Sequence, residues 1–335
     1  MQINGRKLGQ SEPCYIIAEI GANHGGDYNK MEQLVRSVKD TGADAVKFQT
    51  YTADALTIKC ESDLFQIKEG PWAGRNLYDL YREAAMPLDW HGPLKELCES
   101  IDLTWFSSPF SPALVHYLDA IDCPALKIAS FEANDPQIVR AAMRTGRPLI
   151  VSMGAMKIKD AASLVQICND IAILHCTSEY PCSFDSVGLE AVGLLRRLYP
   201  CPVGLSDHTK GIEAPVAAVA LGANVIEKHI GDGLDGDFAL SPDEFTRMVE
   251  AIRNVEKAMG PKQNKEVKLR RSLFIVKDVK AGDVLTAENL RSIRPGDGLA
   301  PKHYELALGR RATKDAVRGT PLTWELIGGS YGRTP

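Results

Sequence analysis

The sequence lacks any apolar run long enough to cross a membrane, and its opening, MQINGRKLGQ, lacks the apolar core of a signal region. Its eight cysteines are scattered without CxxC spacing. The formal net charge of -4 excludes a broad electrostatic attraction to nucleic acid or to anionic membranes. These absences predict a cytoplasmic protein with reduced thiols and with any cationic site confined to a small pocket.

What the chain does contain is enough apolar material for a large core. Its 335 residues are 44% hydrophobic and 24% charged, as expected of one large domain or of a large domain with a small companion. Short apolar segments rich in β-forming residues recur eight times: YIIAEI at 15, AVKFQT at 45, LTWFSS at 103, ALKIAS at 125, PLIVSM at 148, IAILHC at 171, PVGLSD at 202 and NVIEKHI at 224.

Segments with helical patterning separate these strands, and several of them begin at Asn, Asp or Ser and end near Gly. Strands that are apolar along their whole length suit a parallel sheet that is buried on both faces. Eight alternating units of this kind predict an α/β fold, a (β/α)8 TIM barrel. A doubly wound open sheet is the alternative that these patterns leave open.

The pattern also divides the chain. Residues 1–260 form the predicted barrel domain, in which residues 1–14 read as a capping hairpin around Asn4-Gly5. The polar segment at 261–272 is a predicted linker, and 273–335 is a small β-rich domain with Gly-Asp and Pro-Gly turns. Because so short a segment makes a marginal core, we expect this domain to dock on another surface.

Polar side chains follow or end every predicted strand, at the edge where barrel enzymes hold their catalytic groups. Lys47 and Lys127, with nearby serine hydroxyls, suit a compact dianion such as a phosphate or a phosphorylated carboxylate. His208 and His229 end adjacent strands and suit a weakly held divalent metal ion, Mn2+ or Mg2+ rather than structural zinc. Taken singly, each lysine or histidine is more often an ordinary salt-bridged or core residue.

Seven ordered blocks carry a resemblance to a known family: IIAEIGANHGG, GADAVKFQT, FSSPF, LKIASFE, HCTSEYP, GLSDHT and VIEKHI. In this order they resemble the sialic acid (nonulosonic acid) synthases, barrel enzymes that condense phosphoenolpyruvate with a sugar. The tail, with KDVKAGDVLT and RSIRPGDGL, is similar to the antifreeze-like (SAF) domain of that family. Finer features, such as KFQTYTADALT and WAGRNLYDLYREAAMPLDWH, look most like the pseudaminic acid synthase branch.

The resemblance implies a transferase that joins phosphoenolpyruvate to the open-chain aldehyde of an acetamido sugar, giving a nine-carbon keto acid and phosphate. For the pseudaminic branch the sugar is 2,4-diacetamido-2,4,6-trideoxy-L-altropyranose. It further implies that His208 and His229 hold the metal, and that Glu19 and Glu132 are sugar-binding and acid–base groups. The implied phosphoenolpyruvate ligands are Lys47, Ser108, Lys127, Ser130, Ser152 and Ser206.

For the sugar, the resemblance implies Gln49, Tyr180, Asp235 and Arg294, the last of these reaching in from the other subunit of a domain-exchanged homodimer. The chain departs from the family pattern at Ser178, where asparagine is common, and in the loop HIGDGLDGDFALSPDEF, which is shorter than usual. Within that loop Asp232, Asp235 and Asp237 compete for one role, and we choose Asp235 for its spacing to Ser241-Pro242.

Three other functions compete with this prediction. The first is an N-acetylneuraminate or legionaminate synthase, which uses N-acetylmannosamine or a related acetamido sugar. The second is a metal-dependent barrel aldolase or deoxy-sugar phosphate synthase, which needs extra basic residues and has no SAF-like tail. The third is a non-catalytic sugar-binding barrel, which predicts the loss of one or more of the polar groups at the strand ends.

Overall fold

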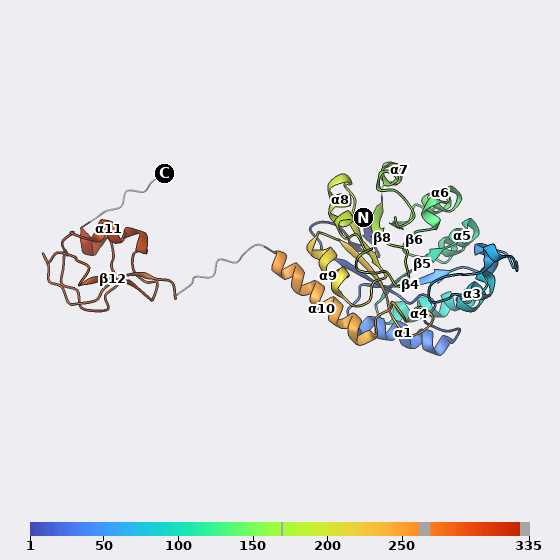
Figure 1. The fold of residues 1–335 in the computed structure, drawn as a ribbon, viewed down its shortest axis with the longest axis horizontal. Coiled ribbons are helices and arrows are strands. Elements are labelled where there is room, and N and C mark those ends of the chain that lie inside the picture. The colour runs from blue at the N-terminus through green and yellow to red at the C-terminus, as the bar shows by residue number, and fades with distance from the viewer. Residues whose placement is uncertain (169, 261–268, 329–335) are drawn as a thin grey trace. The chain divides into compact units, whose positions relative to one another are not determined.

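Eight parallel strands close into a barrel in a computed structural model that describes residues 1–168, 170–260 and 269–328 (Figure 1). The strands are β3 (Tyr15–Glu19), β4 (Ala45–Thr50), β5 (Thr104–Pro109), β6 (Leu126–Ile128), β7 (Leu149–Ser152), β8 (Ile171–Cys176), β9 (Val203–Asp207) and β10 (Val225–His229). Strand β10 pairs with β3, from Val225 opposite Tyr15 to His229 opposite Glu19, and this pairing closes the ring. The predicted TIM barrel is confirmed.

Helices follow the strands and surround the barrel (Figure 1). They are α1 (Tyr28–Asp40), α2 (Ala53–Leu56), α3 (Leu77–Ala84), α4 (His91–Ser100), α5 (Pro112–Ala120), α6 (Pro136–Arg144), α7 (Ala161–Ile167), α8 (Glu190–Leu198), α9 (Glu213–Ala220) and α10 (Pro242–Met259). Capping residues in the sequence mark the starts of several of these helices. Ser241 caps α10 in a reciprocal capping box with Glu244, and α5 and α6 each place proline directly after a capping Ser111 or Asp135.

The N-terminal segment forms a short hairpin of β1 (Gln2–Ile3) and β2 (Arg6–Lys7) around Asn4 and Gly5. Both turn residues have positive φ, 46° and 83°, as this kind of two-residue turn requires. Ile3 is fully buried in the barrel core, and Asn4 Nδ2 lies 3.4 Å from the hydroxyl of Thr104, the first residue of β5. The hairpin therefore lies at the end of the barrel where the strands begin, opposite the polar strand ends.

The chain divides into two compact units, Met1–Gly260 and Pro261–Pro335. In the second, β11 (Ser272–Ile275) pairs antiparallel with β12 (Leu290–Ile293), and α11 (Tyr304–Ala307) follows. Its small core is built from Leu273, Ile275, Val279, Leu285, Leu290 and Leu322. Residues 261–268 of the predicted linker and 329–335 of the predicted small domain lie outside the described residues, and β11 begins at the last linker position, Ser272.

None of the helices within the described ranges combines the length and the apolar composition that a membrane span needs.

Candidate active site

Four charged side chains form a continuous buried network inside the barrel. Glu19 Oε2 lies 2.7 Å from Lys47 Nζ, and the Glu227 carboxylate lies 3.7 Å from Lys47 Nζ and 3.6 Å from Lys127 Nζ. All four residues are at most 4% exposed. Lys47 and Lys127 are in the middle of β4 and β6 rather than at their ends, so the network lies below the mouth. Two ammonium groups and two carboxylates leave the network with no net charge.

Serine hydroxyls predicted for this site contact the network directly. Ser108 Oγ accepts a 3.2 Å hydrogen bond from Lys47, Ser152 Oγ accepts one of 2.7 Å from Lys127, and Ser206 Oγ donates to Glu227 over 2.9 Å. The hydroxyl of Ser107 lies 2.6 Å from that of Thr50 instead. Because strand residues alternate between faces, Ser108 faces the barrel interior and Ser107 faces away.

The network sets opposite pKa shifts on its two lysines. Burial disfavours the charged form of Lys47, but the carboxylates of Glu19 and Glu227 outweigh burial and raise its pKa. For Lys127 burial dominates, and Glu227 offsets it only in part, so its pKa is lowered. Burial also opposes the charge on Glu227, yet the two lysines hold its pKa at about 2. Of the two ammonium groups, that of Lys127 is therefore the one whose charge the neighbouring carboxylates offset less.

Sequence reasoning missed Glu227, although the segment VIEKH contains the signal for it. Side chains alternate along a strand, so an inward His229 requires an inward Glu227 and an outward Lys228. The outward Lys228 is fully buried and pairs over 2.6 Å with Asp207. Asp207 also accepts from the Thr209 hydroxyl over 3.0 Å, so its carboxylate stabilises the outer side of the barrel rather than orienting His208.

His208 and His229 lie together above the network, with ring centroids 5.5 Å apart. His208 Nδ1 lies 3.0 Å from the carbonyl oxygen of Thr177, which assigns the proton to Nδ1 and leaves the Nε2 lone pair available. His229 Nδ1 lies 3.2 Å from Asp235 Oδ2, an ion-pair distance without the alignment of a hydrogen bond. Burial and the neighbouring His229 lower the pKa of His208 to about 3, so it is neutral at pH 7.

These two imidazoles fit a divalent ion, because each has an oxygen atom near Nδ1, a hydrogen-bonded carbonyl for His208 and a carboxylate at 3.2 Å for His229, and such oxygens are typical neighbours of histidine ligands. No cluster of three or more His, Cys, Asp or Glu side chains suited to a metal occurs in the part of the chain that the structure describes. An ion held here would therefore take its remaining ligands from water and substrate, which favours a weakly held, oxygen-preferring metal.

The neutral state of His208 predicts acid destabilisation of the metal-free protein. Burial holds its folded pKa at about 3, against 6.5 in the unfolded chain. Between these values the unfolded state binds the extra proton, so the stabilisation present above pH 6.5 is lost as the pH falls, by at most about 1.4 kcal/mol per pH unit. In urea unfolding with a chelator, His208→Asn should flatten this slope, whereas the exposed His116→Asn should not. An unchanged slope in His208→Asn would contradict the assignment.

The structure separates the three acids of the loop after β10. Asp235 is buried, accepts a 3.0 Å hydrogen bond from the Ala22 amide and faces His229. Asp232 is exposed and pairs with Lys30 over 2.8 Å, and Asp237 is exposed as well. Gly21 permits this arrangement, because it has a φ of 55° and a Cβ there would lie 2.1 Å from Asp235 Oδ2.

A cavity of about 220 Å3 opens above the network, at the mouth of the barrel. Predicted site residues among those that line it are Gln49, Ser130, Glu132, Tyr180, His229 and Asp235. Ser130 accepts a 2.8 Å hydrogen bond from Ser178, and Gly154 allows this approach because a Cβ there would lie within 2.7 Å of both hydroxyl oxygens. The structure thus gathers fourteen of the predicted positions of the barrel unit around one mouth.

The two predicted carboxylates, Glu19 and Glu132, lie at different depths in the barrel. Glu19 is fully buried and committed to Lys47 and to Gln49, whose Nε2 donates to it over 2.8 Å. Glu132 lines the cavity, and its Oε2 has no hydrogen-bond partner among the described residues. Burial raises the pKa of Glu132, which brings the carboxyl group closer to the range of a general acid.

Arg294 belongs to the second compact unit, so its position relative to the barrel is not part of the described geometry. It is exposed, and its guanidinium makes no ion pair with any residue in the described ranges.

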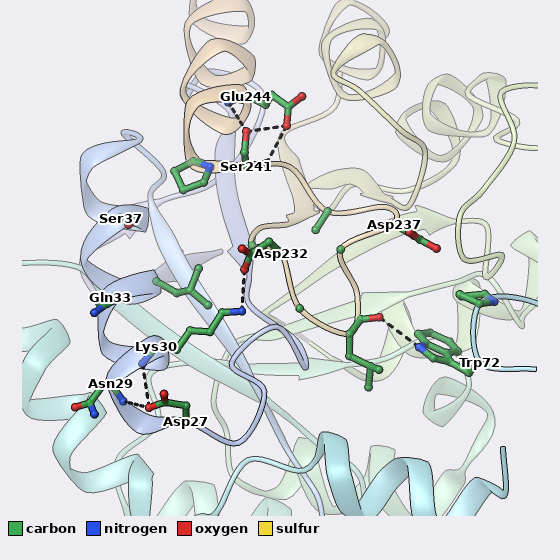
Figure 2. Close-up of a pocket in the computed structure, with 18 residues that line it drawn as sticks. Asp27, Asn29, Lys30, Gln33, Ser37, Trp72, Asp232, Asp237, Ser241 and Glu244 are labelled. Carbon is green, nitrogen blue, oxygen red and sulfur yellow. Dashed lines mark hydrogen bonds and ion pairs between the residues drawn. The ribbon is translucent and has the colours of Figure 1, made fainter.

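A second hollow lies outside the mouth, between α1 and the loop after β10 (Figure 2). Its volume is about 970 Å3, and acidic and basic side chains that line it include Asp27, Lys30, Asp232, Asp237 and Glu244. Trp72, whose indole Nε1 donates to the carbonyl oxygen of Leu234 over 3.3 Å, lines both this outer groove and the inner cavity. The predicted site residues did not include Trp72.

Comparison with known proteins identifies the family. Residues 34–264 match the NeuB family, and residues 270–327 match the SAF domain. The chain belongs to the NeuB family. It is 41% identical over 328 residues to a pseudaminic acid synthase of Campylobacter jejuni subsp. jejuni, a match that covers 92% of this chain and 95% of that protein.

Other NeuB relatives extend the match over nearly the whole chain. A pseudaminic acid synthase of Helicobacter pylori is 39% identical over 330 residues, covering 93% of this chain and 97% of that protein. The crystal structure of a spore coat polysaccharide biosynthesis protein from Bacillus subtilis is 30% identical, covers 98% of both chains and superposes with a TM-score of 0.67. The predicted family, its barrel and its SAF domain are confirmed.

Proposed function

We propose that this protein is a pseudaminic acid synthase, which condenses phosphoenolpyruvate with the open-chain aldehyde of 2,4-diacetamido-2,4,6-trideoxy-L-altropyranose and releases phosphate. The observation that carries the proposal is the 39–41% identity to pseudaminic acid synthases over more than 90% of both chains. The N,N'-diacetyllegionaminic acid synthase of Legionella pneumophila is less similar, at 33% identity.

The lysine network is the proposed binding site for phosphoenolpyruvate. Lys127 has one carboxylate neighbour at 3.6 Å, so an incoming phosphate or carboxylate group can approach its ammonium group. Lys47, Ser108, Ser152 and Ser206 complete the cation and hydroxyl set from adjacent strands. Because strands hold these groups, the enol carbon is presented to the aldehyde in a fixed orientation, which supplies much of the rate.

The charge of the network supports a need for a cation. Its two lysines are balanced by Glu19 and Glu227, so the anionic groups of phosphoenolpyruvate enter a site with no spare positive charge. When held by His208 and His229, Mn2+ or Mg2+ would supply this charge and Lewis-acid polarisation of the sugar aldehyde. The neutral His208 keeps its Nε2 lone pair available for such an ion.

Glu132 is the proposed acid–base residue. Glu132 lines the cavity, its Oε2 has no hydrogen-bond partner among the described residues and its pKa is raised, so it can deliver a proton to the aldehyde oxygen or take one from the attacking water. Glu19 is too deeply buried and too closely paired with Lys47 for that role, and we assign it to positioning Lys47. Gln49, Tyr180 and Asp235 are left to bind the sugar hydroxyl and acetamido groups.

Arg294 is proposed to act in trans, in a domain-exchanged homodimer. The two units carry opposite formal charges, which supports docking of one on the other: residues 1–260 have 24 basic and 35 acidic residues, or -11, and residues 261–335 have 15 and 8, or +7. Arg294 is exposed on the basic unit and makes no ion pair among the described residues, as required of a side chain that reaches the barrel of another subunit.

Arg294→Ala is expected to raise KM for the sugar by about tenfold or more while changing KM for phosphoenolpyruvate less than threefold, because a lost charge-assisted hydrogen bond costs about 1.5–3 kcal/mol. Mixed refolding tests the trans arrangement. In a heterodimer of Arg294→Ala and His229→Ala subunits, action in trans leaves one site intact: the barrel of the Arg294→Ala subunit keeps its His229 and receives Arg294 from the other subunit. Activity at low sugar concentration should therefore exceed that of either homodimeric variant. No recovery in a verified heterodimer would contradict action in trans.

The mass of the reaction product tests the proposed function. Protein incubated with phosphoenolpyruvate, Mn2+ and the diacetamido trideoxy sugar should release phosphate and yield a product whose mass is the sum of sugar and pyruvate. N-acetylmannosamine serves as the competing acceptor. A higher kcat/KM with N-acetylmannosamine would reassign the protein to the neuraminate type, and sugar binding without phosphate release would make it a non-catalytic barrel.

A further inference from the structure

Trp72 lines both the inner cavity and the outer groove. Figure 2 shows its indole at the outer groove, hydrogen-bonded to Leu234. The inner cavity has a volume of about 220 Å3 and the outer groove about 970 Å3. The Trp72 side chain is half-buried between them. Leu234, which accepts the hydrogen bond from the indole, also lines both hollows.

The segment that carries Trp72 is an ordered strap between α2 and α3. Gln66 bridges Asn76 in antiparallel fashion, and the Ile67 amide donates to the Arg75 carbonyl over 2.9 Å. Gly70 and Gly74 have φ values of 83° and 84°, which lets the chain reverse on either side of Trp72. The strap therefore presents the indole in a defined position.

Contacts from the barrel hold the indole in place. Besides the 3.3 Å hydrogen bond to the Leu234 carbonyl, its ring centroid lies 6.1 Å from that of Tyr180 and 6.4 Å from that of Phe238. Tyr180 and Phe238 are themselves 5.3 Å apart in a T-shaped contact. These three rings, which we call the aromatic wall, form an apolar side of a cavity whose other lining residues include the polar Gln49, Glu132 and Asp235.

The cavity is lined largely by apolar and aromatic side chains, which besides the aromatic wall include Tyr51, Tyr81 and Phe110, with a few polar groups among them. Such a lining selects a ligand that carries both methyl groups and hydrogen-bonding groups. The sugar of the proposed reaction carries such methyl groups on its acetamido substituents and at C6. We propose that Trp72 is a specificity-determining residue, whose indole packs against a methyl-bearing substituent of the acceptor sugar and excludes larger substituents by closing the cavity toward the groove. This inference rests on the proposed function.

Trp72→Ala tests the closure. A hydrophobic pocket discriminates one added methylene by about 10–200-fold, so the unmodified protein should prefer the acetamido sugar over its propanamido analogue by at least about tenfold in kcat/KM. Trp72→Ala should reduce this preference to less than threefold, and KM for phosphoenolpyruvate should change less than twofold. If the methyl at C6 is the group recognised, the preference for the 6-deoxy sugar over its 6-hydroxy counterpart collapses instead. Both preferences unchanged would overturn the proposal.

A binding measurement provides a readout that does not depend on turnover. Adding the acceptor sugar without phosphoenolpyruvate should change the intrinsic tryptophan emission, and Trp72→Phe should abolish most of this change. Trp90→Phe is the matched control, because Trp90 packs on His24 and Tyr28 instead of the aromatic wall. An emission change that persists in Trp72→Phe and disappears in Trp90→Phe would also overturn the proposal.

The two failures are distinguishable. If the unmodified protein releases no phosphate with any acetamido sugar, the proposed function is wrong. If it turns over the sugar and Trp72→Ala retains the same preferences with an unchanged thermal unfolding midpoint, only the role of Trp72 is wrong.

Discussion

His229→Ala is expected to lower kcat with phosphoenolpyruvate and the diacetamido sugar by about a thousandfold or more, because Lewis-acid stabilisation of the transition state is worth several kcal/mol. His229 is the residue at which the metal and the sugar site meet: its ring lies 5.5 Å from His208, and its Nδ1 faces Asp235. His208→Ala should have an effect of the same size, since His208 is the other imidazole proposed to hold the ion.

Binding of Mn2+, followed by electron paramagnetic resonance or calorimetry, separates a lost ligand from a damaged fold. Both alanine variants should lose the ion while retaining the circular dichroism of the barrel. His116→Ala, on the exposed side of α5, should bind Mn2+ as the unmodified protein does. Full turnover together with unchanged Mn2+ affinity in either His208→Ala or His229→Ala would remove the metal assignment.

Lys127→Met is expected to raise KM for phosphoenolpyruvate by about a hundredfold, because it removes the ammonium group whose charge the neighbouring carboxylates offset less. It should also destabilise the protein by up to about 3–5 kcal/mol, since it leaves the buried Glu227 carboxylate with the Ser206 hydroxyl and with one ammonium group, that of Lys47 at 3.7 Å. Methionine keeps most of the lysine volume, so neither effect follows from a cavity.

The double variant Lys127→Met/Glu227→Gln divides the two effects. Removing both charges should restore most of the stability lost in Lys127→Met, as measured by urea unfolding. Because the ammonium group is still missing, KM for phosphoenolpyruvate should stay high. Recovery of KM together with stability would mean that Lys127 maintains the fold and does not bind the donor.

The positions of the strands, helices and strand-end residues of the barrel could be predicted from the sequence because they depend on local sequence pattern. A strand buried on both faces must be apolar along its length, and several helix starts carry a capping side chain, such as Ser241 for α10 and Asp135 for α6. The same regularity carries the ends of β9 and β10 to one mouth, which brings His208 and His229 together although they are 21 residues apart. Glu227 obeys the same alternation, but it lies two residues before the end of β10, outside the strand-end positions on which the prediction was based.

Contacts between residues far apart in the sequence could not be predicted from the sequence. Trp72 meets Leu234 across 162 positions of sequence, and Asp235 receives the Ala22 amide across 213. Spacing to Ser241-Pro242 selected Asp235 over Asp232 and Asp237, but no local pattern shows which residues its carboxylate contacts, because all three lie in one glycine-rich loop. Their roles differ only because the loop turns one carboxylate under Gly21 and leaves the other two in solvent.

The sequence by itself determined the family, the alternation of strands and helices, and the kinds of polar group at the barrel mouth, because periodicity and short motifs are properties of neighbouring residues. Only the tertiary structure decided which charges neutralise each other, which carboxylate faces the cavity and which ring closes it. Those outcomes depend on distances of a few ångströms between segments far apart in the chain, and the energies of buried charges and aromatic contacts change over that same range.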